Sequence, residues 1–338
     1  MELNRFVKDE YFKIDCEAHL YGDVGHLHYF KWHQQGAKAA PGITRFMGFD
    51  DPELLKDLPP PPEGLASSPP EALIELMDKY GIDMACVIRE DVSIASGYAA
   101  PYSTNGQLLE ACQKYPDRFV FVATVSPVLK RGMENALWEL EYLVKERGCK
   151  VAKLIGEQCR FDDRQLWPFY EKVRELGLVL FIHTGAAWLP PQPTKYYHPE
   201  GLDEVATNFP EIPIVAFHAG WPHTRVLNMI AATHPNVHIQ LSMILPWCIT
   251  IPRRAAEIVG EALQFAGPDR VIFGTDYFGP RAELLIRLSV QGLSEFEIPE
   301  DMQKGYNFAP LTSEVKRKIF GENLAKLLGI EPKRKVGL

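Results

Sequence analysis

The sequence has no long apolar run and no dense block of basic residues. No stretch approaches the roughly 20 consecutive apolar residues that a membrane-spanning helix needs, and residues 1–15 lack the apolar core of a signal peptide. Lysine and arginine number 36 against 44 aspartates and glutamates, which leaves a formal charge of −8. A nucleic-acid partner needs a basic surface that neutralises phosphates. We therefore expect a cytoplasmic protein with no nucleic-acid partner and no membrane contact.

The sequence also lacks the spacings of several well-known sites. Its six cysteines are scattered without a Cys-x-x-Cys pair, which favours reduced, mostly buried thiols over disulfides or a sulfur-ligated metal. It contains no glycine-rich phosphate loop, no Gly-x-Ser-x-Gly motif and no internal repeat. Nothing therefore indicates a phosphate-loop enzyme, a serine hydrolase of that type or a repeat protein.

The composition is that of a globular protein able to bury a large core, with 46% hydrophobic and 24% charged residues. From residue 69 onward, short β-branched runs alternate with longer helical patterns, which is typical of βα units and a parallel sheet. We expect eight strands, at 11–16, 82–88, 119–125, 150–155, 178–183, 212–218, 236–241 and 270–275. Helices are expected at 69–80, 104–115, 131–147, 163–176, 200–209, 222–234, 252–266, 281–291 and 312–328.

Eight βα units predict an α/β fold of the (β/α)₈ barrel type, with residues 1–338 as a single domain. An open doubly wound sheet with an extra strand would give a similar pattern. Two insertions interrupt the alternation. Residues 20–68 show almost no strand pattern and contain four consecutive prolines, so we expect a lid over the substrate pocket or a contact in a homodimer or higher homo-oligomer. Residues 292–311 form a second insertion after the eighth unit.

Acidic residues and histidines occur at the carboxyl ends of four expected strands, where barrel enzymes carry their active sites. The period of two predicts that Asp15, Glu17 and His19 share one face of the first strand, opposite Ile14, Cys16 and Ala18. The fifth, sixth and eighth strands end in His183, His218 and Asp276. Each residue alone is more simply a packing histidine or a capping aspartate. Four such strand ends that open onto the same rim indicate a functional site.

These residue types suit a divalent cation. Two imidazoles and two carboxylates match the ligands that zinc accepts, and manganese fits an oxygen-rich set as well. We expect one zinc or manganese ion, held by Glu17, His19, His183 and Asp276. The remaining His218 then lies beside the ion as an acid, a base or an oxyanion partner, because histidine titrates near neutral pH.

Six segments of the chain resemble the amidohydrolase superfamily, in its branch of metal-dependent enzymes similar to aminocarboxymuconate semialdehyde decarboxylase. They are DCEAHL, KYPDRFVFVATVSP, IHTG, IPIVAFHAGW, RVIFGTDYF and KIFGENLAKLLGI. The resemblance implies a (β/α)₈ barrel, one divalent metal with the four ligands given above, and a catalytic His218. Most of the superfamily has His-x-His on the first strand. The form Glu17-x-His19 is more similar to the hydroxybenzoate, resorcylate and 5-carboxyvanillate decarboxylases.

One feature departs from those decarboxylases and leaves the substrate class open: they often have an acidic residue soon after the sixth-strand histidine, and this chain reads HAGWPHTR there. A carboxylate substrate needs a cation near the metal, and Lys153, Arg89 and Arg225 are available. An ion pair with Glu157 is an equally good account of Lys153. The aromatic residues that follow ligand-bearing strands are Trp188, Trp221, His223, Tyr277 and Phe278. Together they favour a planar substrate, although loop packing explains any one of them.

Three functions remain open at this point. The favoured one is non-oxidative decarboxylation of a small aromatic or conjugated carboxylic acid, with Asp276 or His218 as the catalytic acid and no nicotinamide, flavin or pyridoxal cofactor. The alternative is a hydrolase for an amide or lactone, in which Asp276 takes a proton from metal-bound water and His218 stabilises the oxyanion. A non-catalytic barrel with a structural metal is disfavoured, because such a site would not need His218.

Overall fold

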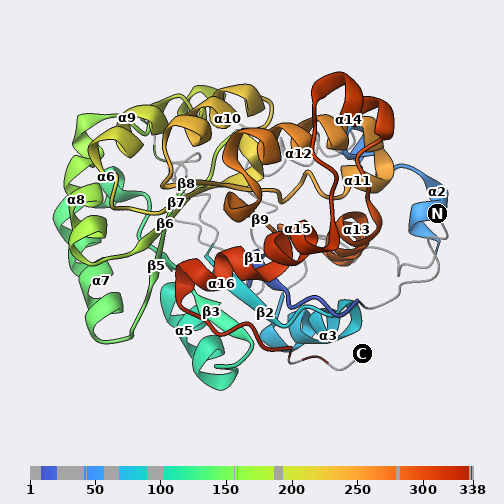
Figure 1. The fold of residues 1–338 in the computed structure, drawn as a ribbon. Helices are drawn as coiled ribbons and strands as arrows, with labels where there is room; N and C mark the ends of the chain where they lie inside the picture. Colours follow the sequence, from blue (N-terminus) through green and yellow to red (C-terminus); the bar gives the residue numbers. More distant parts are fainter. Residues whose placement is uncertain are drawn as a thin grey trace.

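The computed structural model describes residues 9–20, 42, 44–56, 68–89, 103–155, 157, 159–185, 193–278, 282–334 and 336. Strands in the middle of the molecule are surrounded by helices (Figure 1). The strands are β1 Ile14–His19, β2 Met84–Ile88, β3 Phe119–Phe121, β4 Ala123–Thr124, β5 Val151–Leu154, β6 Val179–Ile182, β7 Ile214–Ala216, β8 Val237–Gln240 and β9 Val271–Ile272. Neighbouring strands are parallel and follow chain order.

The strands form a ring. The predicted third strand is divided into β3 and β4 at Val122, whose amide still donates a hydrogen bond to Val87 O (3.3 Å). At the other side, the segment after β9 pairs with β1: the Cys16 amide donates to Phe273 O (3.2 Å) and the His19 amide donates to Tyr277 O (3.0 Å). An open sheet would leave its first and last strands unpaired. The predicted (β/α)₈ barrel is therefore confirmed.

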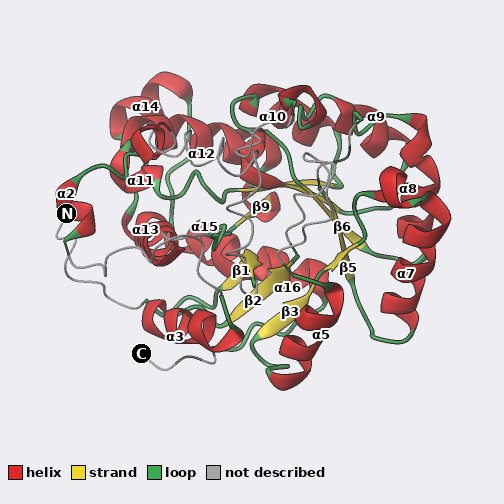
Figure 2. Ribbon diagram, turned by 180° about the vertical axis from the view of Figure 1, so that it is seen from behind, coloured by secondary structure: helices red, strands yellow, loops and turns green. Residues whose placement is uncertain are grey.

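Helices cover the outside of this ring (Figure 2). They are α2 Pro52–Leu55, α3 Pro70–Tyr80, α5 Asn105–Lys114, α6 Val128–Arg131, α7 Met133–Lys145, α8 Trp167–Glu175, α9 Gly201–Asn208, α10 Thr224–Thr233, α11 Trp247–Thr250, α12 Pro252–Ala266, α13 Ala282–Glu295, α14 Glu300–Tyr306, α15 Ser313–Arg317 and α16 Asn323–Leu328. Short 3₁₀ turns lie at Arg164–Leu166, Thr194–Tyr196, Phe217–Gly220 and Pro268–Arg270, and a π turn at Lys318–Glu322 joins α15 to α16. No described helix is both long and apolar enough to span a membrane.

Local sequence explains several helix boundaries. Thr104 caps α5 in a capping box, since its hydroxyl accepts from the Gln107 amide (3.2 Å) while the Gln107 side chain accepts from the Thr104 amide (2.8 Å). The helix predicted at 131–147 corresponds to α7, and a short helix that was not predicted, α6, precedes it; Gly132, with φ of 95°, separates the two. Helix α13 continues into the predicted second insertion at 292–311, which also contains α14.

Two hydrophobic clusters support the barrel. One joins outward-facing strand residues to the helices, and the other joins strand residues such as Phe181 and Phe217 and is closed at one end by α16. Ile14 and Cys16 belong to the second cluster but Ala18 belongs to the first, because the register of β1 against β2 shifts between Asp15 and Ala18. The strict alternation predicted for this strand is therefore wrong: a bulge-like irregularity changes which side chains share a face.

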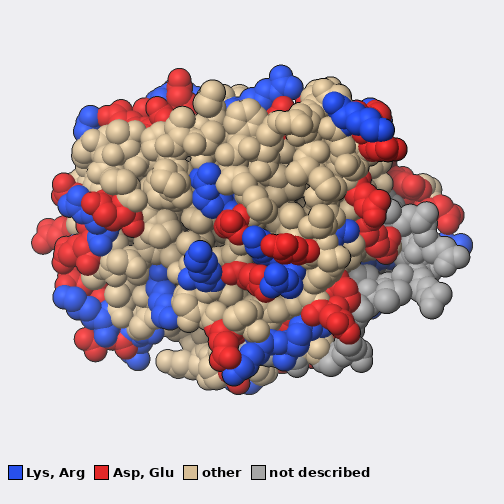
Figure 3. Space-filling model, viewed as in Figure 1, with Lys and Arg blue, Asp and Glu red and all other residues tan. Residues whose placement is uncertain are grey.

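The surface carries both signs of charge. Figure 3 shows lysine and arginine interspersed with aspartate and glutamate over the face viewed. Several of these residues form exposed ion pairs, such as Arg253 with Asp301 at 2.7 Å. Exposed pairs of this kind contribute about 0–1 kcal/mol each. The stability of the fold therefore comes mainly from the buried clusters.

Candidate metal and active site

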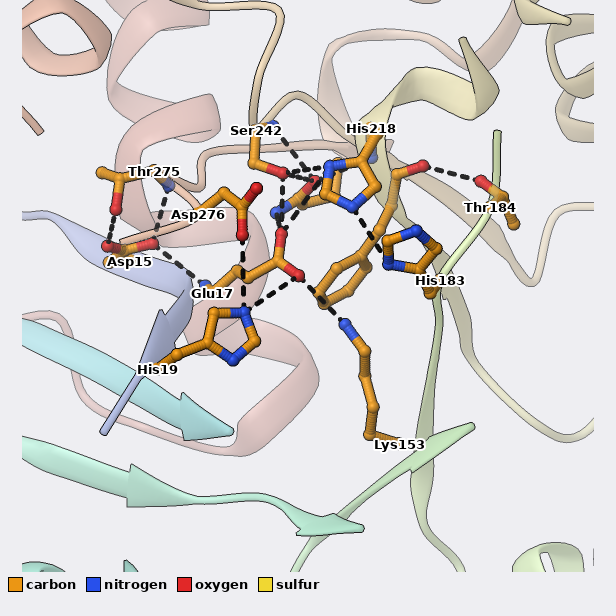
Figure 4. A network of polar contacts seen from close by, with 12 residues as sticks. Asp15, Glu17, His19, Lys153, His183, Thr184, His218, Ser242, Thr275 and Asp276 are labelled. Atoms are coloured by element: carbon orange, nitrogen blue, oxygen red, sulfur yellow. Dashed lines mark hydrogen bonds and ion pairs between the residues drawn. The ribbon is translucent and has the colours of Figure 1, made fainter. Parts of the chain in front are cut away.

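The five residues predicted to form the site lie together at the carboxyl ends of the strands (Figure 4). Glu17 and His19 are on β1, and the other three follow β6, β7 and β9. They make two overlapping groups, Glu17 with His183 and His218, and Glu17 with His19 and Asp276. Within each group the nearest donor atoms lie within 4.8 Å of one another. Glu17 therefore stands at the centre of the cluster, as the member that both groups share.

The distances between donor atoms fit a metal ion. His19 Nε2 lies 3.4 Å from Asp276 Oδ1 and 3.7 Å from Glu17 Oε1, and His218 Nε2 lies 3.2 Å from His183 Nδ1. Two ligands bound to one ion at about 2.1 Å with tetrahedral angles are roughly 3.4 Å apart. The donor set of nitrogen and carboxylate oxygen atoms also suits zinc or manganese. Neither group contains all four predicted ligands, since His183 is grouped with His218 and not with His19 and Asp276. Which of the five bind one ion therefore stays a prediction.

Glu17 is buried among donors that stabilise its charge. Its Oε1 lies 3.1 Å from Lys153 Nζ, and its Oε2 accepts from Gln240 Nε2 (3.2 Å) and Ser242 Oγ (2.7 Å). Burial opposes ionisation, but the Lys153 ammonium and then the adjacent His218 hold the pKa of Glu17 well below its usual range. The carboxylate is thus kept ionised, as a metal ligand must be.

Lys153 points into the barrel rather than toward the helices. Its ammonium lies 3.4 Å from the centre of the Phe217 ring, in a cation–π contact, and its side chain is fully buried. The alternative partner, Glu157, instead accepts from the Val128 amide (2.7 Å) at the start of α6. Of the two sequence interpretations of Lys153, the ion pair with Glu157 is therefore wrong. The structure also pairs Lys153 with a candidate metal ligand and not with an open face of the site.

The backbone is strained where the site residues leave their strands. Among the described residues, His218 (φ 58°), Ala219 (φ 50°), Met243 (φ 64°) and Asp276 (φ 56°) are non-glycine residues with positive φ at this end of the barrel. Each such conformation costs about 1–3 kcal/mol and persists only where the surroundings hold it. Here the His218 amide donates to Gln240 Oε1 at 3.0 Å. Strain concentrated at strand ends that carry histidine and aspartate supports a functional role for this region.

Asp15 connects the first and last strands beneath the cluster. Its carboxylate accepts from the Glu17 amide (3.0 Å), the Thr275 amide (2.9 Å) and the Thr275 hydroxyl. Burial raises the pKa of Asp15 to about 7, against the opposing effect of these hydrogen bonds. Asp15 thus fixes the relative positions of Glu17 and the residue that follows Thr275, which is Asp276.

A family model described as amidohydrolase matches residues 14–330 of the chain. This chain belongs to the amidohydrolase family. The resemblance inferred from the sequence is therefore confirmed. The protein fluG of Emericella nidulans is 27% identical over 136 residues, which are 40% of this chain and 15% of that protein, so the chain spans a small part of that relative.

Solved structures share the fold of this amidohydrolase over nearly its whole length. An uncharacterised TIM-barrel protein from Bordetella bronchiseptica superposes with a TM-score of 0.64 at 20% identity, covering 94% of this chain and 98% of that one. A 2,6-dihydroxybenzoate decarboxylase from Rhizobium has a TM-score of 0.62 at 16% identity, covering 94% and 99%. The 5-carboxyvanillate decarboxylase of Novosphingobium aromaticivorans, complexed with manganese and a nitrobenzoic acid, has a TM-score of 0.62 at 17% identity, covering 98% and 100%.

The cations expected near a metal ion are placed differently from one another. Arg89 lies at the end of β2 and donates to Thr124 O at the end of β4 (3.1 Å), so it is at the same end of the barrel as the cluster. Arg225 is largely exposed on α10 and its guanidinium pairs with Glu257 (2.9 Å) and Glu261 (3.2 Å) of α12. The structure therefore does not bring Arg225 to the cluster.

The expected aromatic residues also separate into groups. Phe278 meets the His19 ring edge to face, with the ring centres 5.7 Å apart. Trp221 instead packs against Trp247 (5.6 Å) and against Phe46 (4.5 Å), a residue of the first insertion. His223 and Tyr277 make other contacts, with His198 and Ser68. Trp188 lies outside the described residues.

The first insertion is described at 20, 42, 44–56 and 68, and the rest of 20–68 lies outside the described residues. Its described part packs against the segment after β8: Met47 O accepts from the Thr250 hydroxyl at 3.0 Å, and a Cβ at Gly48 would lie 2.8 Å from Thr250 Cβ. This packing connects the insertion to the carboxyl end of the barrel. Its roles as a lid or an oligomer contact stay predictions.

Two site residues were missed by the sequence analysis. Gln240 ends β8 and Ser242 follows it, and both contact Glu17 and are fully buried. A signal was present, because polar residues at positions i and i+2 end an apolar strand here, as on β1. Neither glutamine nor serine is a usual ligand of zinc or manganese, so a prediction based on histidine, glutamate and aspartate at strand ends gave the seventh expected strand no role.

Proposed function

We propose that this amidohydrolase is a divalent-metal-dependent carboxy-lyase that decarboxylates a small aromatic or similarly conjugated acid without oxidation. The observation that carries the proposal is the central position of Glu17 in both donor groups. With Asp276, Glu17 gives the ion two carboxylate ligands. An ion with such ligands is a weaker Lewis acid than one with a histidine-rich set, and it suits chelation of a hydroxyaryl acid better than generation of hydroxide.

The comparisons support the same substrate class. Six of the solved structures with this fold are decarboxylases of a dihydroxybenzoate or of 5-carboxyvanillate, and three of the six are named with manganese. We therefore propose zinc or manganese as the cofactor, held by Glu17, His19, His183 and Asp276. When bound, the ion would supply chelation of the substrate carboxylate and of an adjacent oxygen.

The charges of the cluster favour an anionic substrate. With both carboxylates ionised, Glu17 and Asp276 together outweigh Lys153 by one negative charge, and a divalent cation reverses this to one positive charge. When Asp276 carries the proton that an acid must deliver, the site is more positive by one further unit. Arg89 lies at the same end of the barrel and adds a further cation. Phe278, whose ring meets His19, is suited to contact the face or edge of a planar ring. Together these residues would orient a ring that carries a carboxylate.

His218 and Asp276 are the proposed acids of the reaction. Asp276 has a side chain 19% exposed, while those of Glu17 and His19 are 2–3% exposed, so it is the carboxylate that a substrate can reach. One of the two acids delivers its proton to the ring carbon that bears the carboxylate. The bond from that carbon to the carboxylate then breaks, its electron pair returns to the ring, and carbon dioxide leaves. One proton is consumed for each carbon dioxide released.

Heavy water distinguishes this reaction from hydrolysis. We expect hydroxybenzoates to release carbon dioxide and the product to carry one deuterium at the carbon that lost the carboxylate. Small lactones and amides serve as the comparison substrates. If they are opened, with labelled oxygen from water in the product, and no hydroxybenzoate releases carbon dioxide, the amidohydrolase is a hydrolase and the proposal is wrong.

A further inference from the structure

Ser242 lies between the central carboxylate and the histidine proposed as an acid. Its Oγ is 2.7 Å from Glu17 Oε2 and 2.8 Å from His218 Nδ1. The direct distance from His218 Nδ1 to Glu17 Oε2 is 3.8 Å, which is too long for a hydrogen bond. The serine hydroxyl therefore bridges two groups that do not bond to each other (Figure 4).

The orientation of the neighbouring amide determines where the serine proton goes. Gln240 Oε1 accepts from two backbone amides, those of His218 and Ser242, each at 3.0 Å. This leaves Gln240 Nε2 to donate to Glu17. Gln240 Oε1 is also 2.8 Å from Ser242 Oγ, but its two lone pairs are already used by the backbone amides. The ionised carboxylate of Glu17 is the stronger acceptor, so the hydroxyl proton points to Glu17.

A hydroxyl has a single proton, so once Ser242 donates to Glu17 it can only accept from His218. We propose that Ser242 is a positioning residue that sets His218 in the tautomer with the proton on Nδ1. The other ring nitrogen, Nε2, is then the atom that takes and gives the catalytic proton. This nitrogen lies on the side of His183, at 3.2 Å from its Nδ1. The catalytic part of this inference rests on the proposed function of His218, whereas the tautomer does not.

Burial makes the serine difficult to replace by water. Ser242 and Gln240 are fully buried, and Glu17 and His218 are 1% and 3% exposed. The Gln240 amide is also packed closely against the backbone, because a Cβ at Gly274 would lie 2.2 Å from Gln240 Nε2. The hydroxyl of Ser242 is thus the one group placed to accept from His218 Nδ1 among the described residues.

Nitrogen NMR of histidine tests the inference without any substrate. Protein labelled with ¹⁵N-histidine and loaded with diamagnetic Zn²⁺ is measured at mildly alkaline pH, and the His218 signals are identified by their absence in His218→Gln. The ring shifts should report a proton on Nδ1 in the wild-type protein and in Ser242→Thr, which keeps the hydroxyl. In Ser242→Ala the Nδ1–H tautomer should no longer dominate. Ser289→Ala is the matched control, since Ser289 is also fully buried and its hydroxyl makes no hydrogen bond within the described chain.

Turnover is the second measurement. Ser242→Ala should lower kcat by about 10- to 100-fold with little change in KM and in metal content, and Ser242→Thr should restore most of the loss. A proton on Nε2 of His218 in the wild-type protein, or an unchanged tautomer in Ser242→Ala, would overturn the inference. If the tautomer behaves as expected but no acid is decarboxylated by the wild-type protein, the proposed function fails and the role of Ser242 in placing the proton stands.

Discussion

Replacing Lys153 by methionine tests whether the charge of Glu17 depends on it. The substitution removes the ammonium that lies 3.1 Å from Glu17 Oε1 and leaves Ser242 and Gln240 as neutral donors to a carboxylate that is 1% exposed. Breaking a buried ion pair in this way costs about 3–5 kcal/mol, because the remaining charge is unpaired. With an unfolding entropy of about 2.1 cal/mol/K per residue over 338 residues, Tm should fall by about 4–7 °C.

Lys13→Met is a matched control for this substitution. Lys13 is also fully buried, pairs with a carboxylate, Asp9, and lies over aromatic rings, those of Phe320 at 4.9 Å and Tyr11 at 6.0 Å. Asp9 has a side chain 19% exposed, so it keeps contact with water when the lysine is removed. We therefore expect Lys13→Met to lower Tm by less than Lys153→Met. Thermal unfolding followed by circular dichroism measures both.

Metal and pH provide two further readouts of the same variant. Added Zn²⁺ should raise the Tm of Lys153→Met more than that of the wild-type protein or Lys13→Met, because the cation compensates the unpaired Glu17. Lys153 holds the pKa of Glu17 low, so its stabilising effect is present above the usual carboxyl pKa and is lost as the pH falls below it. The difference in Tm should thus narrow on acidification. An unchanged Tm in Lys153→Met at neutral pH would refute the reasoning.

Three other predictions follow from particular contacts. His183→Ala should lower the metal content from close to one ion per chain, whereas His218→Ala should keep the ion and lose turnover; full activity in metal-stripped protein would contradict the site. Gly274→Ala should displace the Gln240 amide, because Gln240 Nε2 would lie 2.2 Å from the new Cβ. We expect kcat to fall by about 10-fold, and urea unfolding of the same variant measures its stability. Burial lowers the pKa of His238 to about 4, so on acidification the unfolded chain protonates this imidazole at a higher pH than the folded protein does. The free energy of unfolding should therefore fall by about 3 kcal/mol between pH 6.5 and 4. His238→Gln should remove that part of the pH dependence, and equal slopes in both proteins would show that the buried imidazole does not cause it.

Periodicity was enough to predict the barrel and most of its strands. Alternation of short apolar runs with amphipathic helices depends on local sequence, and eight such units fix the number of strands in the ring. The division of the third strand at Val122 and the short helix α6 before Gly132 were not predicted, since each depends on the backbone of a single residue. The five clustered site residues were predictable for a related reason: parallel strands in a ring bring all their carboxyl ends to one rim.

The sequence by itself thus determined the fold class and the identity of the acidic and histidine residues at the strand ends. Only the tertiary structure decided which partner each charged side chain takes. Lys153 pairs with Glu17 and not with its sequence neighbour Glu157, and Arg225 pairs with α12 on the outside. Such pairings depend on the shift in register at β1 and on the rotation of each helix about its axis. Both are determined jointly by residues that lie far apart in the chain. Local sequence specifies strand and helix, but a buried charge is placed by the packing of the whole barrel around it.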